Sequence, residues 1–154
     1  MASSVESVQT FLEVHEEILT IAGPAFHAIL RHSIDNPEEL TLAHCTAGKD
    51  PTGLVCAVLL MMLGVDDQDT VNDYALTAHG LEPAIPLLTA RFQKNPVFPD
   101  NIEGAIKWAV RETMVATLQM IREKVCGAEG YIKAYTSLED QDREMLRQTP
   151  LISV

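Results

Sequence analysis

The chain has 154 residues, 47% of them apolar and few of them aromatic, which suits one helix-rich domain with a real core and excludes two domains. Its net charge is −11 and its first 30 residues contain no lysine or arginine, so a nucleic-acid partner is not expected. The longest apolar run is about half the roughly 20 residues of a membrane-spanning helix and the N-terminus has no basic signal region, so we predict a cytoplasmic protein without a transmembrane segment.

The N-terminal segment is predicted to be helical. Apolar residues recur at spacings of three and four from residue 4 to about residue 32. Pro24 lies in the middle of this segment and implies either two helices, the second starting near Gly23, or one kinked helix. A loop follows at residues 34–39, because an Asn-Pro pair favours a turn.

One segment has the pattern of a β-strand. Residues 39–45 alternate Leu40 and Leu42 with other residues between two loops, and we place a strand at Leu40 to His44. One strand cannot form a sheet. Either other strands are hidden, or this strand pairs with another chain, or the chain lacks strands that its relatives have.

The remaining segments are predicted to be helices. Helical patterns cover residues 52–63, 66–76, part of 80–93, 99–125 and 137–146. The longest has an apolar stripe, Asp100 as its N-cap and an i, i+4 pair of Glu103 and Lys107. The fold is therefore predicted to be a single α/β domain over residues 1–154, helix-rich, with few strands packed by about six or seven helices.

The cysteines and histidines do not suggest a metal or disulfide site. The three cysteines form neither an even disulfide set nor a zinc-like pair of pairs, and we expect reduced thiols. The histidines at positions 15, 27, 32 and 79 have no ligand-like spacing. We therefore expect no metal and no cofactor.

The segment "LAHCTAGKDPTGLVCAVLLMMLG", residues 42–64, carries the chemistry. Cys45 lies in a glycine-containing loop that leads into an apolar helix. Backbone N–H groups of such a loop and the positive end of the helix both favour a thiolate, and they also bind a phosphoryl group above the sulfur. The pattern favours phosphoryl transfer to sulfur, followed by hydrolysis of a thiophosphate.

The loop "HCTAGKDPTG", residues 44–53, resembles that of the tyrosine-phosphatase-like family found in microbes, whose pattern is His-Cys-x-x-Gly-Lys-Asp-Arg-Thr-Gly. The segments "LLMMLGV", "VNDYALT", "MVATLQMIREK" and "GAEGYIKAY" also look like that family's downstream segments in the right order. The resemblance covers residue 40 to the C-terminus. Every specified loop position matches except the arginine.

The resemblance implies a role for each loop residue. Cys45 would be the nucleophile, His44 would orient the loop and Thr52 would hydrogen-bond the sulfur. Asp50 would be the general acid, although it suits an N-cap equally well. Lys49 would face the substrate as a positive charge, unless it is only a solvated charge. The phosphate cradle would comprise Thr46, Ala47, Gly48, Lys49, Pro51 and Gly53.

Two departures from the family pattern bear on activity. Pro51 stands where the family has the arginine that holds two phosphate oxygens, and it removes a backbone N–H as well. Only residues 1–43 precede the loop, whereas family members usually have a strand-rich segment there. We therefore expect a shortened fold that lacks the N-terminal sheet.

The predicted function is phosphoric monoester hydrolysis through the Cys45 thiolate, impaired by Pro51. The alternative is an inactive pseudophosphatase that binds phosphate or another protein. The predicted partner is a phosphorylated substrate, namely a phosphotyrosine protein, a phosphoinositide or a small phosphate ester. A second copy or another chain is a further predicted partner, because it would cover the unpaired strand.

Overall fold

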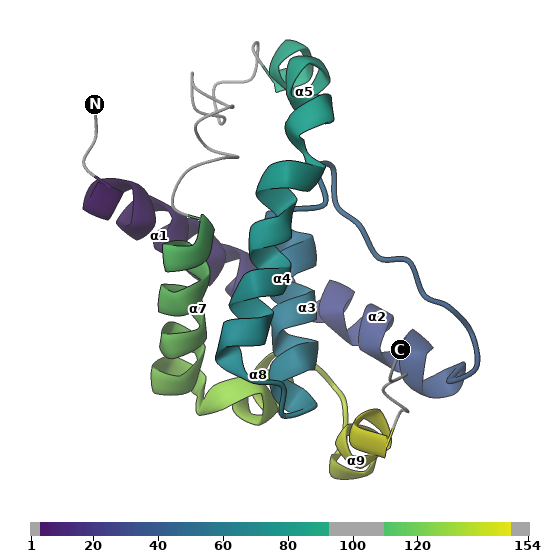
Figure 1. Cartoon of the computed structure of the whole chain (residues 1–154). Helices are drawn as coiled ribbons and strands as arrows, with labels where there is room; N and C mark the ends of the chain where they lie inside the picture. Colours follow the sequence, from purple (N-terminus) through teal and green to yellow (C-terminus); the bar gives the residue numbers. More distant parts are fainter. Residues whose placement is uncertain (1–3, 93–109, 149–154) are drawn as a thin grey trace.

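The computed structural model of the chain describes residues 4–92 and 110–148, and these residues form helices joined by short connections, with one longer extended connection between α2 and α3 (Figure 1). The helices are α1 (Ser4–Ile21), α2 (Gly23–Asp35), α3 (Asp50–Met62), α4 (Asp67–Gly80), the 3-10 helix η1 (Glu82–Ala84), α5 (Ile85–Phe92), α7 (Val110–Val125), α8 (Gly127–Tyr135) and α9 (Asp140–Gln148). The described residues contain no strand, so the predicted α/β class is wrong and this part of the chain is all-α.

Helix α3 lies at the centre of the fold, in contact with α1, α4 and α8. Its sequence is apolar on several faces, and its residues Leu54, Val55, Ala57, Val58 and Met62 are buried. A helix that is apolar all round is stable only when other elements surround it. The helix that begins at the cysteine loop is therefore also the helix around which the others pack.

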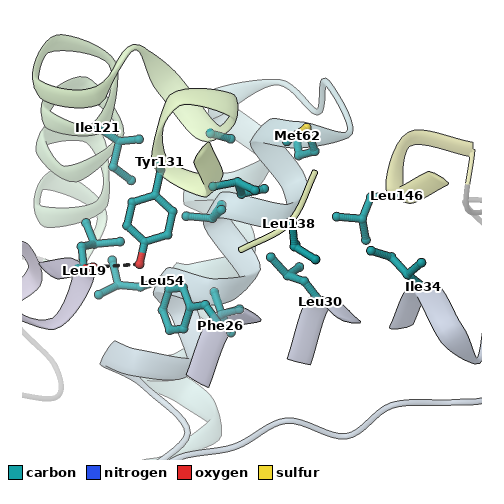
Figure 2. Packing of buried hydrophobic residues seen from close by; sticks show 14 of the residues in the cluster. Leu19, Phe26, Leu30, Ile34, Leu54, Met62, Ile121, Tyr131, Leu138 and Leu146 are labelled. Carbon is teal, nitrogen blue, oxygen red and sulfur yellow. Dashed lines mark hydrogen bonds between the residues drawn. The ribbon is translucent and has the colours of Figure 1, made fainter. Parts of the chain in front are cut away.

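Most of the core is one apolar cluster built from α1, α2, α3, α7, α8 and α9 (Figure 2). Tyr131 is a buried member of this cluster, stacks on Tyr135 and donates a hydrogen bond from its hydroxyl to the carbonyl of Leu19 at 2.8 Å. The bond satisfies the one polar group of this buried side chain. It also ties α8 to the C-terminal part of α1.

Two smaller clusters lie closer to the cysteine loop. Tyr74 of α4 packs with Ala57 of α3 and with Met114 and Leu118 of α7. Leu88 of α5 is buried with η1 and with Ala47 of the loop against it. The loop therefore packs against α5, and the central helix α3 follows it in the chain.

Helix boundaries agree with several of the predicted signals. Pro24 lies in the first turn of α2, which confirms the alternative of two N-terminal helices over one kinked helix. Gly64, with φ +75°, follows α3, and the carboxylate of Asp66 accepts the backbone N–H of Gln68 at the start of α4. Glycine tolerates this left-handed conformation without the steric cost of a side chain.

The C-terminal half differs from the prediction in detail. Helix α7 confirms the helical pattern over residues 110–125, while the predicted start with Asp100, Glu103 and Lys107 lies outside the described residues. A separate helix, α8, occupies residues 127–135, which the two glycines there did not suggest. Helix α9 begins at Asp140 and not at the predicted Ser137.

The predicted strand is an extended connection between α2 and α3. Leu40 is 98% exposed and Leu42 is 88% exposed, and the described part of the chain offers no neighbouring strand with which they could pair. Alternation of apolar and polar residues indicates a segment with one apolar face and one polar face. A β-strand also needs a second strand to hydrogen-bond its backbone N–H and C=O groups. A second chain as cover for these leucines stays a prediction.

None of the described helices is long and apolar enough to cross a membrane. All three cysteines are free, and their reduced state stays a prediction. Cys45 and Cys56 are half-buried and Cys126 is exposed. The cytoplasmic location stays a prediction.

Gly23→Ala is expected to destabilise the fold by about 1–3 kcal/mol. A Cβ at Gly23 would lie 2.1 Å from the carbonyl oxygen of Tyr135, a backbone atom that cannot move without shifting α8. Gly80→Ala is the matched control, because a Cβ there meets nothing within 4 Å and alanine favours the helix. Urea unfolding of both variants measures the effect, and equal midpoints would contradict this packing of α2 on α8.

Candidate active site

The candidate site is the loop that joins the extended connection to α3, with Cys45 at its start and Gly53 in the first turn of the helix (Figure 1). The backbone N–H of Gly53 donates to the carbonyl of Lys49 at 2.6 Å, which closes the first turn. Other N–H groups of this turn have no carbonyl partner within the helix and are available to an anion. The positive end of the α3 dipole therefore faces the loop.

Several hydrogen-bond donors converge on the sulfur of Cys45. Burial by itself raises the pKa of this thiol, but the hydroxyl of Thr52 and the backbone N–H groups of Thr52, Ala47 and Lys49 outweigh it and lower the pKa below its usual 9.0. The hydroxyl of Thr52 also accepts the backbone N–H of Cys45 at 2.9 Å. The side chain of Thr52 thus bridges the two ends of the loop and favours the thiolate.

Two glycines allow the loop to take this shape. Gly48 has φ +69°, a left-handed conformation in which side chains other than glycine are strained. A Cβ at Gly53 would lie 2.4 Å from the ring of Tyr74, so the ring of α4 packs directly on the backbone of α3. Both predicted cradle glycines therefore have a structural requirement for the absence of a side chain.

The other predicted cradle residues surround the cysteine along the chain. The side chain of His44 is exposed, and its Nδ1 lies 2.9 Å from the carbonyl of Cys45, a contact that suits the predicted orienting role. Thr46 is exposed, while Ala47 is half-buried against the cluster of Leu88. Their predicted roles in binding phosphate stay predictions.

Pro51 lies half-buried in the first turn of α3. Proline is well tolerated there, because its fixed φ suits the helix start and its missing N–H breaks no helical bond. The fold therefore accommodates Pro51 easily. The anion cradle, in contrast, has neither a side-chain cation nor a backbone donor at this position.

The side chain of Lys49 points into the protein. It is 6% exposed, and its ammonium lies 2.6 Å from Asp50 Oδ1, 3.1 Å from the Tyr74 hydroxyl and 4.7 Å from the centre of the Phe11 ring. Ion pairing and a cation–π contact hold the charge there. The two roles predicted for Lys49 were a charge that faces the substrate and a solvated charge, whereas these contacts hold its ammonium beneath the loop.

Asp50 forms the centre of a polar cluster. Its Oδ1 accepts from Lys49, from the hydroxyl of Tyr74 at 2.7 Å and from Nε2 of His15 at 3.1 Å. Burial opposes ionisation, but the hydrogen bond from His15 and the charge of Lys49 hold the pKa of Asp50 far below its ordinary 3.8. Burial and the neighbouring Asp50 raise the pKa of Tyr74, so Tyr74 is a neutral donor here.

Sequence reasoning missed three residues that contact this cluster: Phe11, His15 and Tyr74. His15 lies on the same face of α1 as the buried Leu19, and a histidine within an apolar stripe was the available signal. Tyr74 had no comparable signal. Both are far from the loop in sequence.

No group of three or more metal-ligating side chains occurs among residues 4–92 and 110–148. The site in this part of the chain is therefore built from backbone donors, one thiol, hydroxyls and the buried ion pairs. Such a set suits a phosphate or another oxyanion.

The loop and the helix that follows it are typical of cysteine-containing, anion-binding phosphatase-like proteins. Residues 1–151 match the model of the tyrosine phosphatase family, and the chain belongs to that family. A tyrosine-protein phosphatase from Nostoc commune is 36% identical over 70 residues, which cover 46% of this chain and 24% of that protein. The match spans about a quarter of the relative's length. No solved structure matches the chain.

Proposed function

We propose that the chain hydrolyses phosphate monoesters through Cys45, at a rate limited by Pro51. The observation that supports this most directly is the set of donors on the Cys45 sulfur, three backbone N–H groups and the hydroxyl of Thr52. A thiolate is the form of cysteine that attacks phosphorus. The same donors favour the negative charge of a bound phosphoryl group.

The proposed reaction has two steps. The sulfur of Cys45 attacks phosphorus, an S–P bond forms, and the P–O bond to the leaving group breaks. Water then attacks the thiophosphate, which releases phosphate and the thiolate, and the hydroxyl of Thr52 stabilises the departing sulfur. The proposed cradle keeps Thr46, Ala47, Gly48 and Gly53 as predicted.

The general-acid role of Asp50 stays a prediction, and its contacts do not favour it. An ionised carboxylate with three donors on one oxygen has no proton to give a leaving group. We therefore propose that hydrolysis is confined to aryl phosphates, whose leaving group departs as an anion. Among the predicted substrates, phosphotyrosine proteins and small aryl phosphate esters fit this class, and phosphoinositides, whose phosphates are on alkyl oxygens, fit it less well.

The second candidate function is binding without turnover. Pro51 contributes no cation and no N–H, and the ammonium of Lys49 is turned inward. Charge that develops on the phosphoryl oxygens then meets only the backbone N–H groups of the loop and the hydroxyl of Thr52, and no side-chain cation. A pseudophosphatase that binds phosphorylated molecules would keep the cradle and lose the reaction.

Turnover of para-nitrophenyl phosphate separates the two functions. We expect slow release of nitrophenolate that Cys45→Ser abolishes, because serine is not ionised at neutral pH. Cys126→Ser is the matched control, since this exposed thiol is far from the loop in sequence. Activity that survives Cys45→Ser would contradict hydrolysis through this thiol.

Anion binding tests the cradle independently of turnover. Vanadate and inorganic phosphate are expected to raise the melting temperature, because a ligand that binds only the folded state stabilises it. Stabilisation without turnover would favour the pseudophosphatase. No stabilisation by either anion would overturn both functions.

A further inference from the structure

A buried polar cluster links four helices to the cysteine loop. His15 of α1 is 0% exposed and lies between Asp50 of α3 and Thr117 of α7. Tyr74 of α4 and Lys49 of the loop contact Asp50 as well. The proposed reaction uses neither His15 nor Thr117, so the cluster needs another explanation.

Thr117 connects His15 to α7. Its hydroxyl oxygen lies 2.8 Å from Nδ1 of His15 and 2.8 Å from the carbonyl of Thr113. The ring of His15 is therefore attached to α7 by a hydrogen bond between buried groups.

The contact with Asp50 engages the other nitrogen. Asp50 is ionised and can only accept, so Nε2 of His15, at 3.1 Å, donates to it. Each ring nitrogen of this fully buried side chain therefore has a hydrogen-bond partner, one on α3 and one on α7.

These bonds attach the first residue of α3 to two other helices. Asp50 and Lys49 are adjacent in the chain, and the backbone N–H groups of Lys49 and Thr52 are two of the donors on the Cys45 sulfur. A shift of Asp50 would carry both donors with it. A displacement of about 1 Å is enough to weaken an aligned site substantially.

We propose that His15 is a positioning residue of the cysteine loop, which holds Asp50 against α1 and α7 and thereby keeps the loop donors aimed at the Cys45 sulfur. His15 touches neither the thiol nor a substrate in this role. The titratable groups that face it are Asp50 of α3, Lys49 of the loop and Tyr74 of α4, and α7 contributes the hydroxyl of Thr117.

The proposal deepens the proposed function, but its test needs no substrate. Iodoacetamide alkylates thiolates, and mass spectrometry of the Cys45 peptide follows the rate at this thiol as the pH is varied. The midpoint of that profile reports how well the loop donors favour the thiolate. Failure of turnover would therefore leave this test unaffected.

Three substitutions of His15 and Thr117 separate the two bonds. His15→Leu removes both and is expected to raise the midpoint by about one pH unit, which corresponds to a tenfold change in the ionisation equilibrium. His15→Gln keeps a donor toward Asp50 and is expected to restore most of the wild-type midpoint. Thr117→Val removes the second bond alone and is expected to give an intermediate shift.

Tyr131→Phe is the matched control, because it removes a buried hydrogen bond, to Leu19, that belongs to the main core cluster. It is expected to lower stability and leave the Cys45 midpoint unchanged. An unchanged midpoint in folded His15→Leu, or an equal shift in Tyr131→Phe, would overturn the proposal. If His15→Leu does not fold, an unshifted midpoint in Thr117→Val would overturn it.

Discussion

Pro51→Arg is expected to raise the turnover of para-nitrophenyl phosphate by at least about 10²-fold, the effect of one well-placed donor in a transition state. Arginine would supply the backbone N–H that proline lacks and a planar guanidinium that can hold two phosphoryl oxygens. The loop donors on Cys45 are already in place. The change therefore completes an existing cradle.

Two further substitutions at the same position distinguish charge from backbone. Pro51→Ala restores the N–H alone, and Pro51→Lys adds a point charge without the bidentate geometry of the guanidinium. We expect kcat/KM to rise in the order proline, alanine, lysine, arginine. Melting temperatures of the four proteins control for a change in folding.

Equal activity in the arginine and alanine variants would contradict a phosphoryl site above Cys45. The arginine side chain would then have no developing charge to stabilise. If the double variant with both Cys45→Ser and Pro51→Arg keeps the increase in turnover, the reaction does not use Cys45.

The candidate site was largely predictable because its chemistry is local in sequence. The donors on the Cys45 sulfur come from Ala47, Lys49 and Thr52, all within seven residues of it. A glycine with positive φ and a following helix are enough to bring such groups together. The order of residue types in this short segment was therefore enough to indicate which groups lie near the sulfur.

The predicted strand failed for the opposite reason. Alternation of Leu40 and Leu42 describes one segment, whereas a sheet depends on a second segment elsewhere in the chain. In the described residues that second segment is missing, and both leucines face solvent. A pattern in one segment cannot indicate whether its partner exists.

The buried cluster was beyond prediction because it joins distant residues. His15 and Asp50 are 35 positions apart, and His15 and Thr117 are 102 apart. The predicted roles of Lys49 were a charge that faces the substrate and a solvated charge, and those of Asp50 were a general acid and an N-cap. None of them involves α1 or α4, because the loop pattern contains no information about those helices. The inward orientation of these two side chains depends on Phe11, His15 and Tyr74, which only the fold brings together.

Asp50→Ala is expected to destabilise the protein by about 3–5 kcal/mol, the usual cost of removing one partner from a buried ion pair. The substitution would leave the ammonium of Lys49 buried without its anion and Nε2 of His15 without its acceptor. Urea unfolding at neutral pH measures the loss. Glu17→Gln, which removes an exposed carboxylate of α1, is the matched control and is expected to change stability little.

Asp50→Asn tests the same cluster through its pH dependence. The pKa of Asp50 is lower in the folded than in the unfolded state, where it takes its ordinary value of 3.8. The carboxylate therefore stabilises the fold fully above about pH 5, and this contribution declines as the pH falls below about 4. The difference in unfolding free energy between wild type and Asp50→Asn is expected to shrink over that range. A difference that stays constant from pH 6 to pH 3 would mean that Asp50 gains no stabilisation from His15 and Lys49 on folding. The positioning role proposed for His15 would then be contradicted, because it depends on the interaction with the Asp50 carboxylate.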